Sequence, residues 1–524
     1  MGLTPDSARP PTEGGLAAKA AHGSAWTTAQ TVLNKLVTVG ANVILAHLLA
    51  PGDYGLAFLA ANIAVYFFVL PTYVMGDVML ANARRFDAIS GAVNRIAWIA
   101  GAVMFVALAA LALPIEYLDG HSGLAILIVA AATRVLADAA LAVAFARMRL
   151  DLEYRRIAMV DGSVILGATL LGLAMAYFGA GAASITVPPI AAIAARGLIY
   201  RRIKARQLNL QVARDEVRPV VRQYVEAGLG QYLNNIILGL EIVVLGFMTN
   251  QTELGLFVFA ANNAIQANSI IAGQLGAVLQ PIFSHIHDDP HRQIRAFVRA
   301  TRLLSAIAVP LSLIQAVLAV PAFVLLFPPD WTGSIAVFAV LSVAQAFMFV
   351  TAPSVALLKS QGRFRAYLGL QFTQALLSAI TFVVAIWLGG DEALHLARSI
   401  GLPVDPAAGK ALALSIASAA IWAVFCPITV WIAGRPAKLG VGATLGTFFE
   451  PWIVAVPVAA LLVVGWLGLR AALSSQAADI ATVVALAPLA AVVGIVGCVL
   501  LRADTRADAR SLVERFTRRR RGAG

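Results

Sequence analysis

Two basic residues lie deep inside long apolar stretches of the sequence, where a charge is costly. Lys35 is about eleven residues into the apolar segment 24–48, and Arg134 lies at a similar depth in the segment 123–144. A cation at the centre of a bilayer costs roughly 3 kcal/mol even on lenient insertion scales, and such groups usually face the protein interior and mark a pathway. The chemistry that these residues predict is the binding of an anion within a membrane.

The two cations differ in the partners that the sequence offers them. Asp138 lies one helical turn from Arg134 on the same helix face and can pair with it. Such a pair would not exclude contact between Arg134 and a substrate. No acid lies three or four residues from Lys35, so its partner must come from another helix or from a ligand. We favour an anionic ligand.

Polar residues form two stripes at helical spacing, related by an offset of 200 residues. The stripe in segment 24–48 consists of Thr27, Thr31, Asn34, Thr38 and Asn42, and the stripe in segment 223–248 consists of Gln231, Asn234, Asn235 and Glu241. Thr31 matches Gln231, and Asn34 matches Asn234, so the two stripes occupy equivalent helix faces. Hydrogen bonds between helices are one explanation, because Thr, Asn and Gln commonly make them in lipid. Two matched stripes favour a shared polar cavity.

The segment 255–281 is unusually polar for a helix that faces lipid. It carries Asn262, Asn263, Gln266, Asn268, Gln274 and Gln280. We expect much of this segment to line the cavity, where amide donors and acceptors would suit the hydroxyl groups of a sugar. The predicted substrate site comprises Lys35, Arg134, Asn34, Thr31, Thr38, Gln231, Asn234, Asn235, Asn262 and Gln266.

Acidic residues inside the apolar segments are candidates for ion or proton coupling. Glu241 lies deeper than the acids near the helix ends, and it could bind a proton or a cation or could neutralise Lys35. Asp138, beside Arg134, is the second candidate. Asp161 lies near the cytoplasmic end of its segment, so we expect it to be solvated.

The composition is that of a membrane protein. Hydrophobic residues make up 60% of the 524 residues and charged residues only 13%, whereas soluble domains contain about 25% charged residues. Such a chain folds in lipid rather than in water. The sequence contains no nucleotide-binding loop, no HExxH motif and no His and Cys residues at metal-binding spacing. We therefore expect no cofactor, no metal and no enzymatic activity.

Fourteen apolar stretches approach the length of about 20 residues that a bilayer requires. They are 24–48, 55–79, 94–115, 123–144, 158–178, 183–200, 223–248, 255–281, 300–327, 333–357, 367–389, 410–433, 451–469 and 479–501. The sixth is short and contains Pro188 and Pro189, which a helix bundle tolerates because neighbouring groups can satisfy the freed carbonyls. The predicted fold class is an all-α polytopic membrane protein with about 14 transmembrane helices.

Lys and Arg residues are concentrated on one side of the predicted membrane. With the N-terminal side labelled inside, the inside segments hold 34 of the 39 Lys and Arg residues, and the outside loops hold only Arg398, Lys410 and Arg470. Because basic loops face the cytoplasm, we predict an even number of membrane helices with both termini cytoplasmic. A nucleic-acid partner is not expected, since a basic tail beside a membrane helix anchors to anionic lipid.

A repeat divides the chain into two parallel halves. YGLAFLAAN at 54–62 and LGLFVFAAN at 254–262 align at an offset of 200, with Gly55 matching Gly255 and Asn62 matching Asn262. Two such halves are typical of transporters with a central site. The predicted organisation is a cytoplasmic tail (1–23), a six-helix N-lobe (24–200), a basic cytoplasmic connector (201–222), a six-helix C-lobe (223–433), two extra helices (451–501) and a basic cytoplasmic tail (502–524).

The segment LAHLLAPGDYGLAFLA at 45–60 resembles the signature at the end of the first helix in polysaccharide-transporter flippases, the Wzx-type members of the MOP superfamily. The resemblance covers roughly 20–500 and is most specific in 24–62. It implies two six-helix lobes in a pseudo-twofold repeat, with a cationic, partly polar cavity between them. One departure is His47, where the family usually has Arg.

The resemblance also implies a function. Undecaprenyl-pyrophosphate-linked sugar units would move from the cytoplasmic to the periplasmic leaflet by alternating access, for the biosynthesis of O-antigen, capsule or exopolysaccharide. The implied partners are the lipid-linked oligosaccharide, membrane lipids and polysaccharide assembly proteins.

Three rival functions differ from this one in features of the sequence. A multidrug exporter of the same superfamily moves mostly cations, which would favour lone acids over Lys35 and Arg134 in the cavity. A lipid II flippase is closer in chemistry, but the 45–60 signature favours the polysaccharide branch. A polysaccharide polymerase or ligase would carry large periplasmic loops, and the longest predicted outside loop is only 390–409.

Overall fold

The computed structural model of the chain describes residues 33–82, 85–151, 153–205, 214–266, 290–361, 363–437 and 439–500, together with Gln30, Gln211 and Phe283. Nearly all of these residues are in helices, and none of them forms a β-strand. The predicted all-α class is therefore confirmed over the described ranges.

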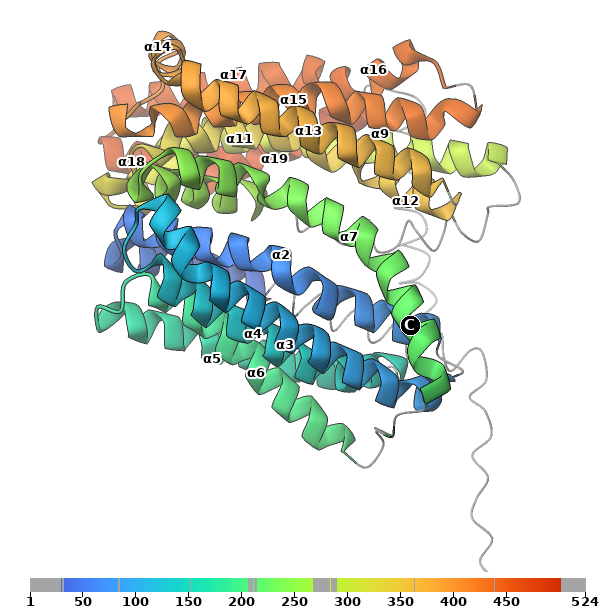
Figure 1. Cartoon of the computed structure of the whole chain (residues 1–524). Helices are drawn as coiled ribbons and strands as arrows, with labels where there is room; N and C mark the ends of the chain where they lie inside the picture. The colour runs from blue at the N-terminus through green and yellow to red at the C-terminus, as the bar shows by residue number, and fades with distance from the viewer. Residues whose placement is uncertain are drawn as a thin grey trace, which may run out of the picture. The chain divides into compact units, whose positions relative to one another are not determined.

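Figure 1 shows the described helices, coloured in chain order from blue to red. After a helix over 33–48 come α2 (Pro51–Ala81), α3 (Phe86–Asp119), α4 (Leu124–Leu150), α5 (Tyr154–Tyr177), α6 (Ala183–Lys204), α7 (Arg214–Met248) and a helix over 251–266. The chain continues with α9 (Pro290–Val317), α10 (Ala319–Leu326), α11 (Ser334–Met348), α12 (Ala352–Ser360), α13 (Phe364–Leu388), α14 (Gly390–Ser399) and α15 (Gly409–Gly434). The last helices are α16 (Val441–Phe449), α17 (Trp452–Ala472), α18 (Ser475–Ala481) and α19 (Ala487–Leu500), with a π-helical turn at Thr482–Leu486.

Ten helices within the described residues are long and apolar enough to cross a bilayer. They coincide with the third to sixth and the ninth to fourteenth predicted stretches, and they make the chain a multi-pass membrane protein. The other four stretches, 24–48, 55–79, 223–248 and 255–281, contain residues whose backbone or side chains lie outside the described part of the chain.

The sixth predicted stretch is a continuous helix in spite of its two prolines. Pro188 and Pro189 lie inside α6. A Cβ added to Gly172 of α5 would lie 3.3 Å from Cγ of Pro188 and 3.0 Å from the carbonyl oxygen of Ser184. Pro188 therefore lies at a close contact between α5 and α6, which the absence of a side chain at Gly172 allows.

The helices pack into two compact units. The first contains residues 1–45 and 63–232, and the second contains residues 46–62 and 233–524. Both α2 and α7 contribute residues to each unit, because the division falls inside these helices.

Helix α4 is the central element of the first unit. It packs against α3 on one side and against α6 on the other, and the three helices lie side by side (Figure 1). Gly101 of α3 faces Val135 and Ala139 of α4, and Gly197 of α6 faces the carbonyl oxygen of Ala137. Small residues at both contacts let the helix backbones approach closely.

The side chain of Lys204, at the end of α6, is buried between two carboxylates. Its Nζ donates to Asp151 at 2.6 Å and to Glu153 at 2.8 Å, and the side chain is only 2% exposed. Asp151 and Glu153 flank the short connection from α4 to α5. Because a buried charge needs paired, hydrogen-bonded partners, Lys204 fixes this connection to the end of α6.

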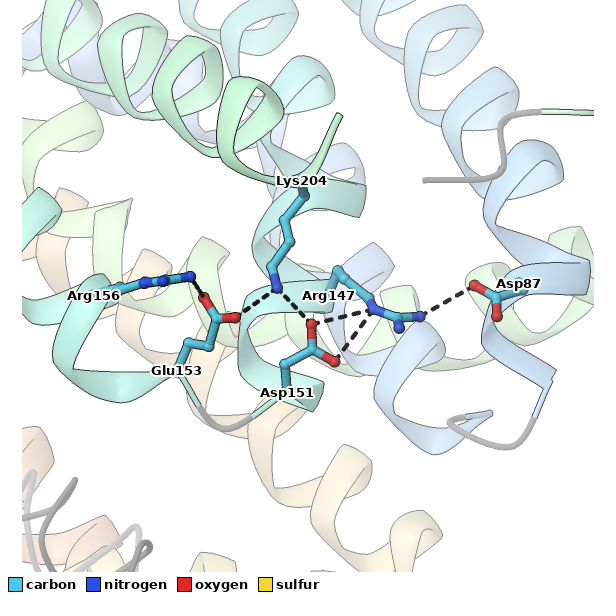
Figure 2. A network of polar contacts seen from close by, with 6 residues as sticks. All are labelled: Asp87, Arg147, Asp151, Glu153, Arg156 and Lys204. Atoms are coloured by element: carbon cyan, nitrogen blue, oxygen red, sulfur yellow. Dashed lines mark hydrogen bonds and ion pairs between the residues drawn. The ribbon is translucent and has the colours of Figure 1, made fainter. Parts of the chain in front are cut away.

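Two arginines extend the Lys204 contact in both directions (Figure 2). Arg147, in the last turn of α4, pairs with Asp151 at 3.3 Å and with Asp87 of the first turn of α3 at 3.1 Å. Arg156 of α5 pairs with Glu153 at 3.1 Å. The 6 side chains alternate in sign, so their charges balance, and they join the ends of four helices on the predicted cytoplasmic side.

Helices α9 and α15 organise the second unit. Helix α9 packs against α11, α17 and α19, and α15 packs against α11, α13 and α14. The buried rings of Phe297, Phe347 and Phe448 belong to one apolar cluster that joins α9, α11 and α16. The two extra helices predicted at the C-terminal end are thus part of this unit, with Gly494 of α19 in contact with Pro310 of α9.

A buried ion pair fixes the turn between α17 and α18. Asp479, 1% exposed, accepts hydrogen bonds from Nη2 of Arg470 at 2.8 Å and from Nε1 of Trp466 at 2.7 Å. The guanidinium of Arg470 also lies 4.7 Å from the centroid of the Trp466 ring. Arg470, predicted in an outside loop, is therefore in the last turn of α17, where Asp479 neutralises its charge.

The predicted outside loop 390–409 contains a short amphipathic helix, α14. Ala393, Leu394 and Ala397 form its buried face, and α14 packs against α15. Asp391 and His395 are on the exposed face.

The first prediction concerns the chain of alternating charges. Replacing Lys204 with Met leaves Asp151 and Glu153 without the ammonium group between them. Removing one partner of a buried pair costs about 3–5 kcal/mol. The two carboxylates are 25% and 23% exposed, so we expect a smaller loss, about 1–3 kcal/mol, measured as a lower Tm in detergent.

Arg156→Met is the matched control for this variant. Its side chain is 59% exposed, and an exposed ion pair contributes less than about 1 kcal/mol. Equal shifts in Tm for the two variants would show that burial of Lys204 is not what fixes the helix ends.

Candidate functional site

The first predicted polar stripe lies on the partly buried face of the helix over 33–48. Asn34, Lys35 and Thr38 are all partly buried, whereas Leu33 and Leu36 are exposed. At about 100° per residue, the three polar residues lie on the side of the helix opposite the exposed leucines. The helix therefore turns an apolar face outward and keeps its charge and amides on the protein side.

Within this stripe, the hydroxyl of Thr38 is used partly by its own helix. It donates to the carbonyl oxygen of Asn34 at 2.8 Å. A threonine hydroxyl bonded in this way still accepts hydrogen bonds through its lone pairs. Thr31, the fourth residue predicted here, lies outside the described residues.

Arg134 and Asp138 form the ion pair that their spacing predicts. Nε of Arg134 lies 3.5 Å from Oδ2 of Asp138, and the side chains are 28% and 2% exposed. The prediction of this pair is confirmed. A guanidinium has five N–H donors, so the exposed part of Arg134 can still donate to a ligand while Asp138 balances its charge.

Glu241 of α7 faces two polar groups of α15 inside the second unit. Its carboxylate approaches the hydroxyl of Ser418 and the indole of Trp422. Ser418 is fully buried. Two further polar residues, Gln374 and Ser378, lie on the buried face of α13, which packs against the same helix. A carboxylate beside neutral polar groups inside an apolar helix can hold a proton or a small cation.

The second stripe and the polar helix after it are described only in part. Asn235 is partly buried, and the side chains of Gln231 and Asn234 lie outside the described part of the chain. Asn262 and Gln266 are partly buried in the helix over 251–266.

A hydrogen bond inside the second unit supports this polar helix. Gln315 of α9 donates from Nε2 to the carbonyl oxygen of Ala264 at 2.7 Å and to the hydroxyl of Ser342 at 3.1 Å. Asn263 donates to the carbonyl oxygen of Phe259 in its own helix at 2.8 Å. Some amide groups of this region therefore form hydrogen bonds within the protein, and Asn262 and Gln266 remain partly exposed.

The expectation that Asp161 is solvated is wrong. Nε of Arg196 lies 2.8 Å from Oδ1 of Asp161, Nη2 donates to Oδ2 at 3.1 Å, and the hydroxyl of Tyr200 donates to Oδ1 at 2.6 Å. The Asp161 side chain is 17% exposed. The acid belongs to α5 and both donors to α6, so no spacing along one helix could have indicated the cluster.

The predicted site residues are divided between the two units. Lys35, Asn34, Thr38, Arg134 and Asp138 belong to the first unit, and Asn235, Glu241, Asn262 and Gln266 belong to the second. Among them the structure joins Arg134 to Asp138 and Thr38 to Asn34.

The chain belongs to a known protein family and shares its fold with solved structures. Residues 44–336 match the model of a family described as polysaccharide biosynthesis protein. No curated protein matches the sequence.

Two solved structures share the fold of the chain. The lipid II flippase MurJ, in an inward closed conformation, aligns with a TM-score of 0.65 and 9% identity, over 89% of this chain and 96% of that one. An inward-facing multidrug resistance MATE family transporter of the MOP superfamily aligns with a TM-score of 0.54 and 13% identity, over 79% and 96% of the two chains. At these identities the similarity establishes the fold.

The second prediction concerns the pair in α4. Arg134→Met removes the ion pair and leaves the carboxylate of Asp138 at a buried position, so we expect a loss of stability of about 2–4 kcal/mol. Asp138→Asn and the double variant complete a double-mutant cycle, in which thermal unfolding should give a coupling energy of about 1 kcal/mol or more. Strictly additive losses would contradict the pairing.

Proposed function

Because the chain belongs to the polysaccharide biosynthesis protein family and has the fold of MOP-superfamily transporters, we propose that it is a flippase for lipid-linked oligosaccharides. It moves sugar units linked to undecaprenyl pyrophosphate from the cytoplasmic to the periplasmic leaflet. These units serve the biosynthesis of O-antigen, capsule or exopolysaccharide. The family match over residues 44–336 carries this proposal.

The chemistry of the substrate headgroup supports the proposed site. A pyrophosphate and a sugar lose their water on entering hydrocarbon, at a cost of several kcal/mol for each unpaired group. Lys35 and Arg134 supply positive charge for the pyrophosphate. Asp138 balances part of the charge of Arg134, and the exposed part of the guanidinium still offers N–H donors. Thr31, Asn34, Thr38, Gln231, Asn234, Asn235, Asn262 and Gln266 supply hydroxyl and amide groups for the sugar.

The transport cycle that we propose is alternating access between two lobes, 24–200 and 223–433, that rock about the central site. The lipid tail stays in the bilayer while the headgroup crosses within the protein. Glu241 and Asp138 are the coupling candidates, and the approach of Ser418 and Trp422 to Glu241 favours Glu241. Its carboxylate takes up a proton or cation in one state and releases it in the other.

The cellular setting follows from the same proposal. The protein lies in the bacterial inner membrane with both termini cytoplasmic, which agrees with 34 of the 39 Lys and Arg residues on one side. The tails 1–23 and 502–524 and the basic connector 201–222 are then cytoplasmic, and the connector lies between the lobes in sequence. Polysaccharide assembly proteins that use the exported unit are the expected partners.

The third prediction tests the anion site. In a strain that lacks the native gene, Lys35→Met should reduce export of the lipid-linked sugar at least about tenfold, because a hydrogen bond to a charged group contributes about 1.5–3 kcal/mol. Arg134→Met should act in the same direction. The measurement is the fraction of lipid-linked sugar that reaches the periplasmic leaflet.

Conservative variants separate the loss of charge from the loss of structure. Lys35→Arg and Arg134→Lys keep the positive charge and should retain more export than the Met variants at equal protein level in the membrane. Normal export by both Met variants would sink the site assignment. Undiminished export of the sugar lipid in the deletion strain, with sensitivity to cationic drugs instead, would favour a multidrug exporter.

The fourth prediction tests the coupling residue. Glu241→Gln keeps the shape of the side chain and one acceptor oxygen, replaces the other oxygen with an NH2 donor, and cannot gain or lose a proton. In vesicles, we expect transport by this variant to lose its response to an imposed proton or sodium gradient. Asp161→Asn is the control, since Asp161 is held by Arg196 and Tyr200. An unchanged gradient response in Glu241→Gln would remove Glu241 from the mechanism.

A further inference from the structure

The two copies of the sequence repeat begin their helices at equivalent positions. Helix α2 begins at Pro51 and its counterpart begins at Gln251, an offset of 200. The amide of Ala50 donates to Oδ2 of Asp53 at 3.2 Å, and the amide of Glu253 donates to Oδ1 of Asn250 at 2.8 Å. Each helix start has one of the two bonds of a capping box. At α2 a side chain in the first turn accepts from the amide before the helix, and at the counterpart the side chain before the helix accepts from an amide in the first turn. Both helix starts are therefore fixed locally, on the side of the membrane predicted to be outside.

Gly55 and Gly255, which are equivalent in the repeat, cross backbone to backbone. A Cβ added to Gly55 would overlap the carbonyl oxygen of Gln251 and would lie 2.9 Å from the nitrogen of Gly255. A Cβ added to Gly255 would overlap the carbonyl oxygen of Pro51. The contact is reciprocal, because exchanging the two copies exchanges its two halves, as in an isologous interface. No side chain fits at either position while the helices are in contact.

The segment 46–62 is held on the second unit by aromatic rings as well as by this crossing. Trp331, 1% exposed, donates from Nε1 to the carbonyl oxygen of Ala46 at 2.9 Å. The ring of Tyr54 lies 5.0 Å from that of Trp331, and the ring of Phe259 lies 4.1 Å from it, centroid to centroid. A segment from the first copy of the repeat thus belongs to the second unit, while α2 continues into the first.

We propose that Gly55 and Gly255 form the closing contact of an outer gate, and that the missing side chains at both positions are what allows the gate to close. The inference rests on the alternating access of the proposed function. A transporter that opens its site to the outside must part the helices that are joined there. The segment 46–62 comes from the N-terminal copy but belongs to the second unit, and it contains the start of α2 on the side predicted to be outside.

The energetics of the crossing suit a gate that has to reopen. Two bare helix backbones in contact are stabilised by many weak dispersion contacts, which are lost gradually as the helices separate. A methyl group at either position forces the helices apart by more than packing can absorb, since inserted bulk in a close-packed contact costs about 1–3 kcal/mol or more. Such a substitution acts on the closed state and spares an open one, so it shifts the population between them.

The structure supplies a reporter for the closed state. A Cβ added to Gly52 lies 3.8 Å from Cβ of Gln251, which is the usual Cβ separation of a disulfide. Gly52→Cys with Gln251→Cys, in a chain whose Cys426 and Cys498 are replaced by Ala, should therefore crosslink when the gate is closed. The native cysteines are both buried, and their removal leaves the engineered pair as the only thiols.

The fifth prediction is made in this reporter chain, oxidised in membranes. The parent pair should crosslink readily, and Gly255→Ala should slow crosslinking about tenfold by moving the population away from the closed state. Gly76→Ala is the matched control, because Gly76 lies in the same α2 and, among the described residues, nothing lies within 4 Å of an added Cβ. It should leave the rate unchanged.

A second variant keeps the test decisive if Gly255→Ala does not fold. Trp331→Phe adds no bulk, but it removes the hydrogen bond to Ala46 and part of the ring contact with Tyr54 and Phe259, so it should slow crosslinking several-fold, in the same direction. Failure of the parent pair to crosslink would overturn the proposal. So would equal rates in the parent, Gly255→Ala and Trp331→Phe, because the crossing would then be fixed packing.

Crosslinking is measured without substrate, so the gate and the proposed function can fail separately. If the crosslinked protein stops exporting sugar lipid and regains export after reduction, both proposals stand. If crosslinking responds to Gly255→Ala as expected but deletion of the gene leaves sugar-lipid export normal, the gate stands and the substrate assignment fails.

Discussion

Every polar group that enters hydrocarbon needs a partner supplied by the protein, and this requirement shapes both units of the chain. Asp161 is held by Arg196 and Tyr200, Asp138 by Arg134, and Asp479 by Arg470 and Trp466. In each cluster, N–H or O–H donors from the same helix or from a neighbouring helix bind a largely buried carboxylate and balance its charge. The function that we propose adds the same requirement for the cargo, because a lipid-linked sugar would also bring charge and hydroxyl groups to a place without water.

The arrangement of small residues determines how closely the helices approach. Gly101 and Gly197 bring α3 and α6 against α4, and Gly55 and Gly255 bring the repeated helices of the second unit into backbone contact. In lipid, apolar side chains gain little from leaving their surroundings, so close backbone packing takes over as the source of helix association. A contact of this kind is specific because a single methyl group disrupts it. The same property makes it suitable for a part of the molecule that must separate and rejoin.

The similarity to MurJ shows how few identities this fold needs. At 9% identity the two structures still align over 89% of this chain and 96% of the other. Many different sequences can provide what the fold requires. These requirements are apolar stretches of the right length, small residues where helices cross, and charged loops on one side of the membrane. The proposed cargo site, in contrast, consists of a handful of polar side chains such as Lys35 and Arg134. Fold similarity therefore does not identify the substrate. The family match over 44–336 indicates a role in polysaccharide biosynthesis.

Features that depend on neighbours along one helix were determined by the sequence itself. The apolar stretches predicted ten of the spans, including the proline-containing α6, and the spacing of four residues predicted the Arg134–Asp138 pair. Contacts between helices were decided only by the tertiary structure. Lys204 bonds to Asp151, Arg196 to Asp161, and Trp331 to Ala46 across 285 residues of sequence. The physical reason is that helical periodicity fixes which residues share a face, whereas the partner of that face depends on how the whole chain packs.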